Sequence, residues 1–210
     1  MSNIIIRVEE PKDYRAVEEL TRAAFNNPDR IARSKIGCPM EHYMVYRLRE
    51  KDGIMELNFV AEMDGRIVGH VIYSSAHILQ PDGSTVDVLN LGPISVLPEL
   101  QKMGIGSMLI RYSIQEAKML GHGAILFFGH PEYYPRFGFV QAKSFGIADC
   151  NGENYPGFMA MELEAGYLGG VNGKFIEADI YNDDLNREQA KEFDRGWNCG
   201  FGYKSSNIHR

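Results

Sequence analysis

The chain has 210 residues, of which 44% are hydrophobic and 24% charged, and its formal net charge is −6. This composition is typical of one globular domain with a sizeable core, and the acidic balance argues against non-specific nucleic-acid binding. No apolar run reaches the ~18 residues of a membrane span, and the N-terminal residues lack the basic and apolar regions of a signal peptide. We therefore expect no nucleic-acid partner and no membrane partner.

The cysteines indicate a reducing compartment. Cys38, Cys150 and Cys199 are odd in number, lie far apart and show no metal-binding pattern such as Cys-x-x-Cys. A disulfide framework is not expected, and we predict a cytoplasmic protein without a metal.

The first third of the chain predicts a strand and two helices. Residues 4–8 are mostly β-branched, which favours a strand. Pro11 stands at the start of a helical pattern over 12–25, in which apolar side chains share one face. A second helical pattern covers 42–49.

A hairpin and a long strand follow. The runs 57–62 and 66–73 flank Asp64-Gly65, and Asp-Gly between two such runs is a strong hairpin signal. Residues 85–96 then form one long strand pattern. Pro93 within it cannot donate a ladder hydrogen bond, so we expect a bulge or a loss of pairing there.

The next segment alternates helix and strand. Residues 105–120 show a clear helical pattern, with Gly121 placed as a C-cap. Residues 124–128 are a continuous apolar run, typical of a buried central strand. Three shorter elements, a helical turn and two strands, are predicted over 132–137, 139–142 and 158–164. Hairpins combined with a single β-α-β crossover predict an α/β fold in which helices cover a mixed sheet.

The C-terminal segment differs from what precedes it. Gly169-Gly170 marks a joint, followed by a predicted strand over 174–180 and a helix over 185–197. We divide the chain into a domain over 1–168 and an appendage over 169–210. The appendage is expected to dock on the main sheet or on another subunit, so a homodimer is an option. The alternative is that it walls part of the functional site.

Residues 91–107 are the most informative stretch. A strand ends at Val96, a turn follows at Pro98, and Gln101 to Gly106 lead into the helix. Free backbone N–H groups at a helix N-terminus bind phosphate, and two glycines let the main chain approach a ligand closely. The segment therefore predicts a diphosphate-bearing cofactor. The chain has neither the Gly-x-Gly-x-x-Gly fingerprint of dinucleotide-binding domains nor a Walker loop.

Two motifs together carry a family resemblance. The spacing Val96-x-Pro98-x-x-Gln101-x-x-Gly104-x-Gly106 resembles the acetyl-CoA motif of the GNAT N-acetyltransferase superfamily. The block from His130 to Phe139, His-Pro-Glu-Tyr-Tyr-Pro-Arg-Phe-Gly-Phe, resembles that superfamily's Tyr placed shortly before Phe-Gly-Phe. The pair also resembles one bacterial and archaeal branch of predicted acetyltransferases. The resemblance covers roughly residues 3–165 and implies the GNAT fold, a mostly antiparallel central sheet flanked by helices.

The resemblance implies a role for each matching residue. Tyr134 takes the general-acid position, while Tyr133 is interpreted as a packing residue. Val96 is expected to polarise the thioester carbonyl through its N–H, and the pantetheine arm to pair with the surrounding strand. Phe127 stands where many members carry an Asn that contacts the cofactor. The expected acetyl-CoA-binding residues are Ile94, Ser95, Val96, Gln101, Lys102, Met103, Gly104, Ile105, Gly106 and Ser107.

The general base is left open. His130, Glu132, Asp87 and Asn90 all lie near the expected cleft, and a water relay is a further option. The implied function is acetyl transfer from acetyl-CoA to a primary amine by direct attack on the thioester. The alternative is a regulatory module that binds acetyl-CoA or another acyl-CoA without turnover. An antibiotic, a polyamine, an amino acid and a protein N-terminus remain open as acceptors.

Overall fold

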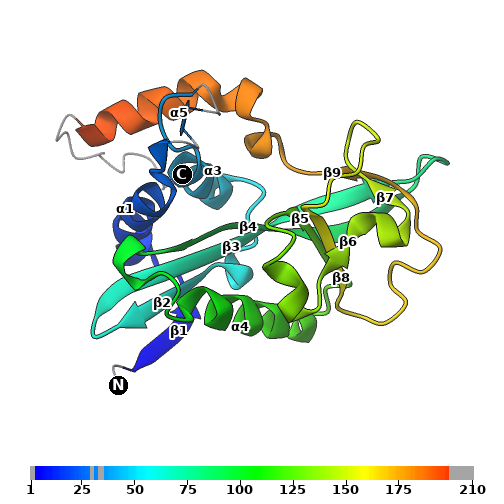
Figure 1. Cartoon of the computed structure of the whole chain (residues 1–210), viewed down its shortest axis with the longest axis horizontal. Coiled ribbons are helices and arrows are strands. Elements are labelled where there is room, and N and C mark those ends of the chain that lie inside the picture. Colours follow the sequence, from blue (N-terminus) through cyan, green and yellow to red (C-terminus); the bar gives the residue numbers. More distant parts are fainter. Residues whose placement is uncertain (1–2, 29–30, 33–35, 199–210) are drawn as a thin grey trace, which may run out of the picture.

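The computed structural model describes residues 3–28, 31–32 and 36–198. Within this part of the chain, helices flank a single nine-stranded sheet (Figure 1). The helices are α1 (Tyr14–Phe25), α3 (Glu41–Glu50), α4 (Ile105–Met119) and α5 (Asp183–Asn198). The strands are β1 (Ile4–Val8), β2 (Phe59–Met63), β3 (Arg66–Leu79), β4 (Thr85–Val96), β5 (Ala124–Phe128), β6 (Val140–Gln141), β7 (Ile147–Ala148), β8 (Phe158–Glu162) and β9 (Gly173–Ile176).

The sheet is mostly antiparallel, as the fold prediction requires. Its main path runs β1-β2-β3-β4-β5-β8-β6, and the parallel neighbours on this path are β4 and β5. Strand β9 pairs with His77–Leu79 of β3, beyond the stretch of β3 that pairs with β2, and carries the short strand β7 on its other side. The C-terminal segment thus contributes a strand to the main sheet.

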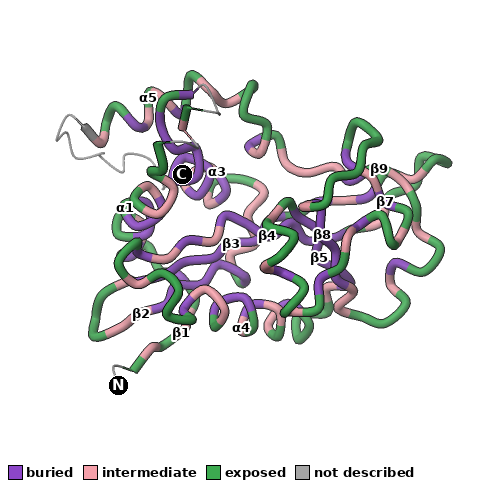
Figure 2. Tube along the Cα trace, viewed as in Figure 1, coloured by how far each residue is buried: buried purple, intermediate pink, exposed green. Residues whose placement is uncertain are grey.

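The two faces of the sheet carry different helices. Val71 and Tyr73 of β3 pack in one cluster with α4, whereas Ile72 between them packs with residues of α3 and α5. This alternation is the two-residue period of a strand buried on both faces. Figure 2 shows the buried residues gathered along these central strands, between the two helical layers.

The predicted bulge lies in β4. Val71 pairs with Ile94 and Tyr73 with Leu91, so one residue of β3 stands opposite Gly92 and Pro93. Proline has no N–H to donate, and the extra residue interrupts the ladder at that point. Pairing of β4 with β5 is confined to Leu89 and Asn90, so the two strands separate on the C-terminal side of the bulge.

Most predicted elements are confirmed, with some shifts. The hairpin strand predicted over 66–73 continues to Leu79, and the strand predicted over 174–180 ends at Ile176, before a 3-10 turn at Asp179–Tyr181. Gly121 caps α4 with a positive φ of 81°. No helix in the described part of the chain is both long and apolar enough to cross a membrane.

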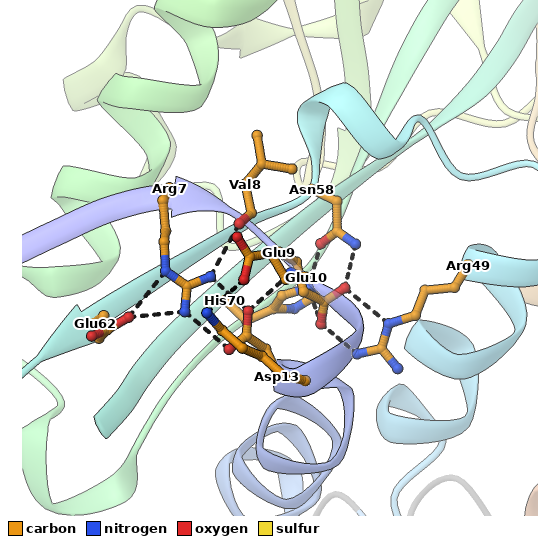
Figure 3. A network of polar contacts seen from close by, with 10 residues as sticks. Arg7, Val8, Glu9, Glu10, Asp13, Arg49, Asn58, Glu62 and His70 are labelled. Atoms are coloured by element: carbon orange, nitrogen blue, oxygen red, sulfur yellow. Dashed lines mark hydrogen bonds and ion pairs between the residues drawn. The ribbon is translucent and has the colours of Figure 1, made fainter. Parts of the chain in front are cut away.

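A buried polar network fixes the helices of one face (Figure 3). The Arg49 guanidinium of α3 pairs with Glu9, just after β1, at 2.6 Å, and with Glu18 of α1 at 2.6 Å. Asn58 donates to Glu9 and lies 2.7 Å from the His70 ring. Burial holds the pKa of His70 well below its ordinary value, so the ring is neutral. The network locks α1 and α3 to the sheet.

Candidate functional site

A cavity of about 580 Å³ opens where β4 and β5 separate. Its walls come from the bulge of β4, the end of β5, the loop that follows β5, and the helices α1 and α3. Glu177, Tyr181 and Asp183 of the C-terminal segment complete it. We expect the appendage to dock on the sheet, and the alternative is that it walls part of the functional site; its residues line this cavity as well as pairing with β3.

A larger hollow of about 830 Å³ lies elsewhere, between α1 and the β2–β3 hairpin. Arg7, Lys12, Glu19, Glu62 and Arg66 are among its lining residues. No residue of the two sequence motifs other than Leu97 lines it. The cavity at the β4–β5 separation is therefore the candidate site.

The turn before α4 has the geometry of an anion site. Lys102 and Gly104 adopt positive φ values of 64° and 94°, and Gly104 is the N-cap of the helix. The first hydrogen bond of the helix runs from the Met108 N–H to the Gly104 carbonyl at 3.0 Å. The amides of Ile105, Gly106 and Ser107 come before this bond, as helix N-terminal amides do, and are available to a ligand.

The side chains around this turn differ in exposure, and two of them hold the turn to neighbouring segments. Gln101, Lys102 and Met103 are exposed, while Ile105 is buried in the core. The Gln101 side-chain amide donates to the Val96 carbonyl at 3.2 Å, which ties the turn to the end of β4. The Ser107 and Tyr133 hydroxyl groups share a hydrogen bond of 3.1 Å. Tyr133 is therefore more than a packing residue, because its hydroxyl engages one of the predicted phosphate donors.

The last residues of β4 present an open strand edge. Ile94, Ser95 and Val96 pair with β3 on one side, and the described part of the chain provides no strand on the other. The Ser95 and Thr21 hydroxyl groups share a hydrogen bond of 2.9 Å, which ties this end of β4 to α1. An open edge of this kind accepts an extended ligand as an added strand.

Tyr134 lines the cavity. The residue is 7% exposed, and Phe127 packs edge-on against its ring with ring centroids 4.4 Å apart. Burial raises the pKa of Tyr134 above its ordinary value. The hydroxyl is therefore protonated at neutral pH and available as a proton donor. Phe127, at the position where the resemblance implies an Asn in many members, packs against this ring.

Glu177 is the site residue that the sequence did not reveal. It follows β9, and its carboxylate accepts a hydrogen bond of 2.8 Å from the Asn90 side-chain amide of β4. Burial raises the pKa of Glu177 from 4.5 to about 7, and the bond from Asn90 opposes this rise. No local sequence pattern around residue 177 indicates that it lines the cavity, because it is the long-range pairing of β9 with β3 that brings Glu177 there.

The other residues named near the expected cleft divide into two groups. His130 and Asn90 line the cavity. Glu132 and Asp87 are exposed and do not line it. Among the described residues, no group of three or more His, Cys, Asp or Glu side chains is placed to hold a metal. Cys38 and Cys150 are free thiols, and Cys199 lies outside the described residues.

The sequence profile of the acetyltransferase (GNAT) family matches residues 15–139, more than half of the chain. The chain belongs to the acetyltransferase (GNAT) family. An uncharacterized N-acetyltransferase of Escherichia coli, YhbS, is 28% identical over 189 residues, which is 88% of this GNAT chain and 99% of YhbS. Another from Escherichia coli, YjhQ, is 33% identical over 93 residues, and this match spans 44% of the chain and 50% of YjhQ.

Solved structures place the fold in the same family. The crystal structure of Escherichia coli YhbS in complex with CoA has a TM-score of 0.74 at 23% identity, covering 87% of this chain and 93% of that one. A GNAT acetyltransferase of Brucella melitensis in complex with acetyl-CoA has a TM-score of 0.65 at 26% identity, covering 86% and 99%. The GNAT fold expected from the two motifs is therefore confirmed.

Proposed function

We propose that this protein transfers the acetyl group of acetyl-CoA to a primary amine by direct attack on the thioester. The observation that carries the proposal is the position of Tyr134. It is a buried, protonated phenol, and it lines a cavity bounded by the open end of β4. The family assignment and the CoA-bound and acetyl-CoA-bound relatives support the choice of the acyl donor.

The residues present fit acetyl-CoA. The diphosphate would be held by backbone N–H groups of 102–107, with the Ser107 hydroxyl as a further donor. The pantetheine arm would lie along Ile94–Val96, where the strand edge is open. In this arrangement the Val96 N–H would stabilise the oxyanion of the tetrahedral intermediate, a contribution of roughly 3 kcal/mol for one pre-aimed donor.

Tyr134 would act when the thioester breaks. Attack of the amine nitrogen on the carbonyl carbon forms the C–N bond, and collapse of the intermediate breaks the C–S bond. The departing thiolate would take its proton from the Tyr134 hydroxyl, which its raised pKa keeps protonated. We place the reaction in the cytoplasm, because a reducing compartment preserves the Cys38 and Cys150 thiols.

Release of CoA thiol in the presence of amines tests this function. Acetyl-CoA would be mixed with the protein and one of four probes: spermidine, kanamycin, lysine, or a short peptide with a free amino terminus. Amine-dependent thiol release, together with the acetylated amine in the mass spectrum, is the expected result. Binding of acetyl-CoA without thiol release from any probe would contradict catalysis and indicate a binding module.

A further inference from the structure

Amine acetylation requires a proton acceptor as well as the acid Tyr134. An alkyl ammonium has a pKa near ~10 and must lose a proton before it can attack. Asp87 and Glu132 do not line the cavity, although the sequence nominates both. Among the carboxylates that do line it, Glu177 has a defined partner on the strand that borders the proposed acetyl-CoA site, the amide of Asn90.

Glu177 and Tyr134 approach the cavity from opposite faces of the sheet. Tyr134 packs in the cluster that contains α4, together with Phe127. Asn90 lies between Leu89 and Leu91, which belong to that same cluster, so its side chain points to the other face. Its bond to Glu177 therefore holds the carboxylate on the face that carries α1, α3 and α5. An acid on one side and a carboxylate on the other would bracket a thioester lying between β4 and β5.

The anchoring of Glu177 is built into the C-terminal segment. The Tyr181 hydroxyl donates to the Gly92 carbonyl of the β4 bulge at 2.8 Å and lies 3.0 Å from the Ser74 hydroxyl. On the other side of Glu177, strand β9 is hydrogen-bonded to β3. Both flanks of Glu177 are thus fixed to strands that border the cavity, so the carboxylate is held in place.

We propose that Glu177, positioned by Asn90, is the general base that takes the proton from the acceptor amine. The inference rests on the proposed acetyltransferase function. The ammonium proton passes to a Glu177 oxygen, and the neutral nitrogen then attacks the thioester carbonyl carbon. As the C–S bond breaks, the sulfur takes the Tyr134 proton. The second proton lost by the nitrogen is passed through solvent to the Tyr134 phenolate and restores the phenol, while Glu177 releases its proton to solvent.

The charges around Glu177 suit a cationic acceptor. Glu41 of α3 and Asp183 of α5 also line the cavity, together with His130, Tyr134 and Tyr181. Carboxylates from three elements favour the approach of an ammonium group. Burial brings the pKa of Glu177 to about 7, so the group is about half ionised at neutral pH, increasingly ionised above it, and able both to take and to release a proton.

The test compares pH–rate profiles of kcat/KM for wild type and Glu177→Gln, with whichever of the four amine probes is most active. The wild-type profile should rise through pH 7 and then level, whereas Glu177→Gln should lack this limb near pH 7. The ratio of the two profiles should therefore change around pH 7 and reach about 100-fold, within the range of general-base catalysis. Glu132→Gln is the matched control, since this exposed carboxylate lies outside the cavity, and its profile should equal that of wild type.

Asn90→Ala supplies an independent readout. Loss of the hydrogen bond to the charged carboxylate should move the wild-type limb to higher pH without removing it, which a purely structural role of Asn90 would not do. If Glu177→Gln does not fold, the shift in the pH profile of Asn90→Ala tests the role of Glu177 by itself. A ratio independent of pH, or an unshifted limb in Asn90→Ala, would overturn the inference while leaving acetyl transfer intact. A wild type inactive with all four probes would overturn the proposed function, and the inference with it.

Discussion

Burial acts on Tyr134 and Glu177 in the same direction but with different consequences. Both side chains lose solvent on folding, and both pKa values rise because the charged form is disfavoured. The pKa of Tyr134 moves further above pH 7, so the side chain stays a phenol. The pKa of Glu177 moves up towards pH 7, so the carboxyl group becomes able to exchange a proton near neutral pH. The same effect of burial would therefore suit Tyr134 to the proposed role of acid and Glu177 to the proposed role of base, a pattern typical of acid–base sites.

Replacing Tyr134 by Phe should reduce kcat by about 100-fold while leaving acetyl-CoA affinity nearly unchanged. The ring and its contact with Phe127 are retained, and only the proton for the leaving thiolate is lost. Steady-state kinetics and calorimetry would measure the two effects. Tyr133→Phe is the matched control: its hydroxyl contacts Ser107, so its loss should weaken cofactor binding rather than turnover. A fully active Tyr134→Phe variant would make solvent the proton source.

Glu177→Gln should also change how stability depends on pH. A carboxyl whose pKa is raised on folding contributes stability that is present below pH 4.5 and is lost as the pH rises through about 7. Glutamine does not titrate, so wild type should lose up to about 3 kcal/mol relative to the variant across this window. Chemical denaturation at pH values on both sides of the window measures the difference. A difference that does not vary with pH would mean that Glu177 titrates normally in the folded protein.

The site residues differ in how far the sequence predicts them. Gly104, Gly106 and Tyr134 stand in short motifs whose spacing reflects local geometry, a helix N-terminus and a turn. Glu177 has no such motif, because it reaches Asn90 across 87 positions of sequence. Its position depends on the pairing of β9 with β3, and long-range pairing of a short strand leaves no local periodicity to read.

Among the elements, the N-terminus of α4 carries the cofactor proposal. A Cβ added to Gly106 would lie 3.7 Å from both the Tyr133 hydroxyl and the Val96 side chain, which is ordinary contact. Gly106→Ala should therefore fold as well as wild type, or better by up to ~1 kcal/mol from helix propensity. The methyl group would nevertheless occupy the proposed diphosphate approach, and acetyl-CoA should bind about tenfold or more weakly.

Calorimetry and melting curves together check the Gly106 prediction. Gly196→Ala in α5 is the control, because its added Cβ meets no atom of the described residues within 4 Å and α5 lies outside the proposed cofactor site. That variant should keep full affinity. Equal affinities for wild type and a folded Gly106→Ala variant would place the diphosphate elsewhere.

The buried network of Figure 3 should matter more for stability than the surface ion pairs on the same helix. The Arg49 side chain is 5% exposed and faces Glu9, which is fully buried. Arg49→Met would leave the Glu9 and Glu18 carboxylates without the guanidinium group that pairs with them, and it should cost about 3–5 kcal/mol of unfolding free energy. Arg47→Met on the exposed side of α3, where Arg47 pairs with Glu50, should cost at most ~1 kcal/mol. Urea denaturation of both variants makes the comparison, and equal losses would contradict it.

The predictability of the elements follows their length and periodicity. Strand β4 has the predicted bounds, and α4 and β5 agree with prediction to within one residue, because a continuous apolar run or a helical stripe marks each of them. The two-residue strand β7 was not predicted, since two residues define no period. Strand β9 was predicted too long, because the apolar residues after Ile176 belong to the turn that carries Glu177 and Tyr181 towards the cavity.

At the scale of the whole molecule, the separation of β4 from β5 leaves a gap in the sheet between its two faces. Helix α4 and the proposed diphosphate turn serve one face, and α1, α3 and the C-terminal segment serve the other. In the proposed reaction, acetyl-CoA and the amine would enter from different sides and meet at this gap. The division of the chain at residue 168 stays a prediction, and residues 199–210 lie outside the described structure.

Acetyl-CoA should stabilise the whole protein, because a ligand that spans β4, the turn before α4 and the cavity binds only the folded chain. At 100 times its dissociation constant it should add roughly 2.7 kcal/mol, which for a chain of this size raises the melting temperature by roughly 5–10 °C. NAD and ATP should protect far less, since the chain has neither of their glycine-rich fingerprints. Thermal denaturation with each ligand at equal concentration is the measurement. Gly106→Ala should lose most of the acetyl-CoA effect and Gly196→Ala none of it. Equal protection by NAD would contradict the cofactor assignment, because it would show that the turn before α4 does not discriminate the ligand for which its geometry is proposed.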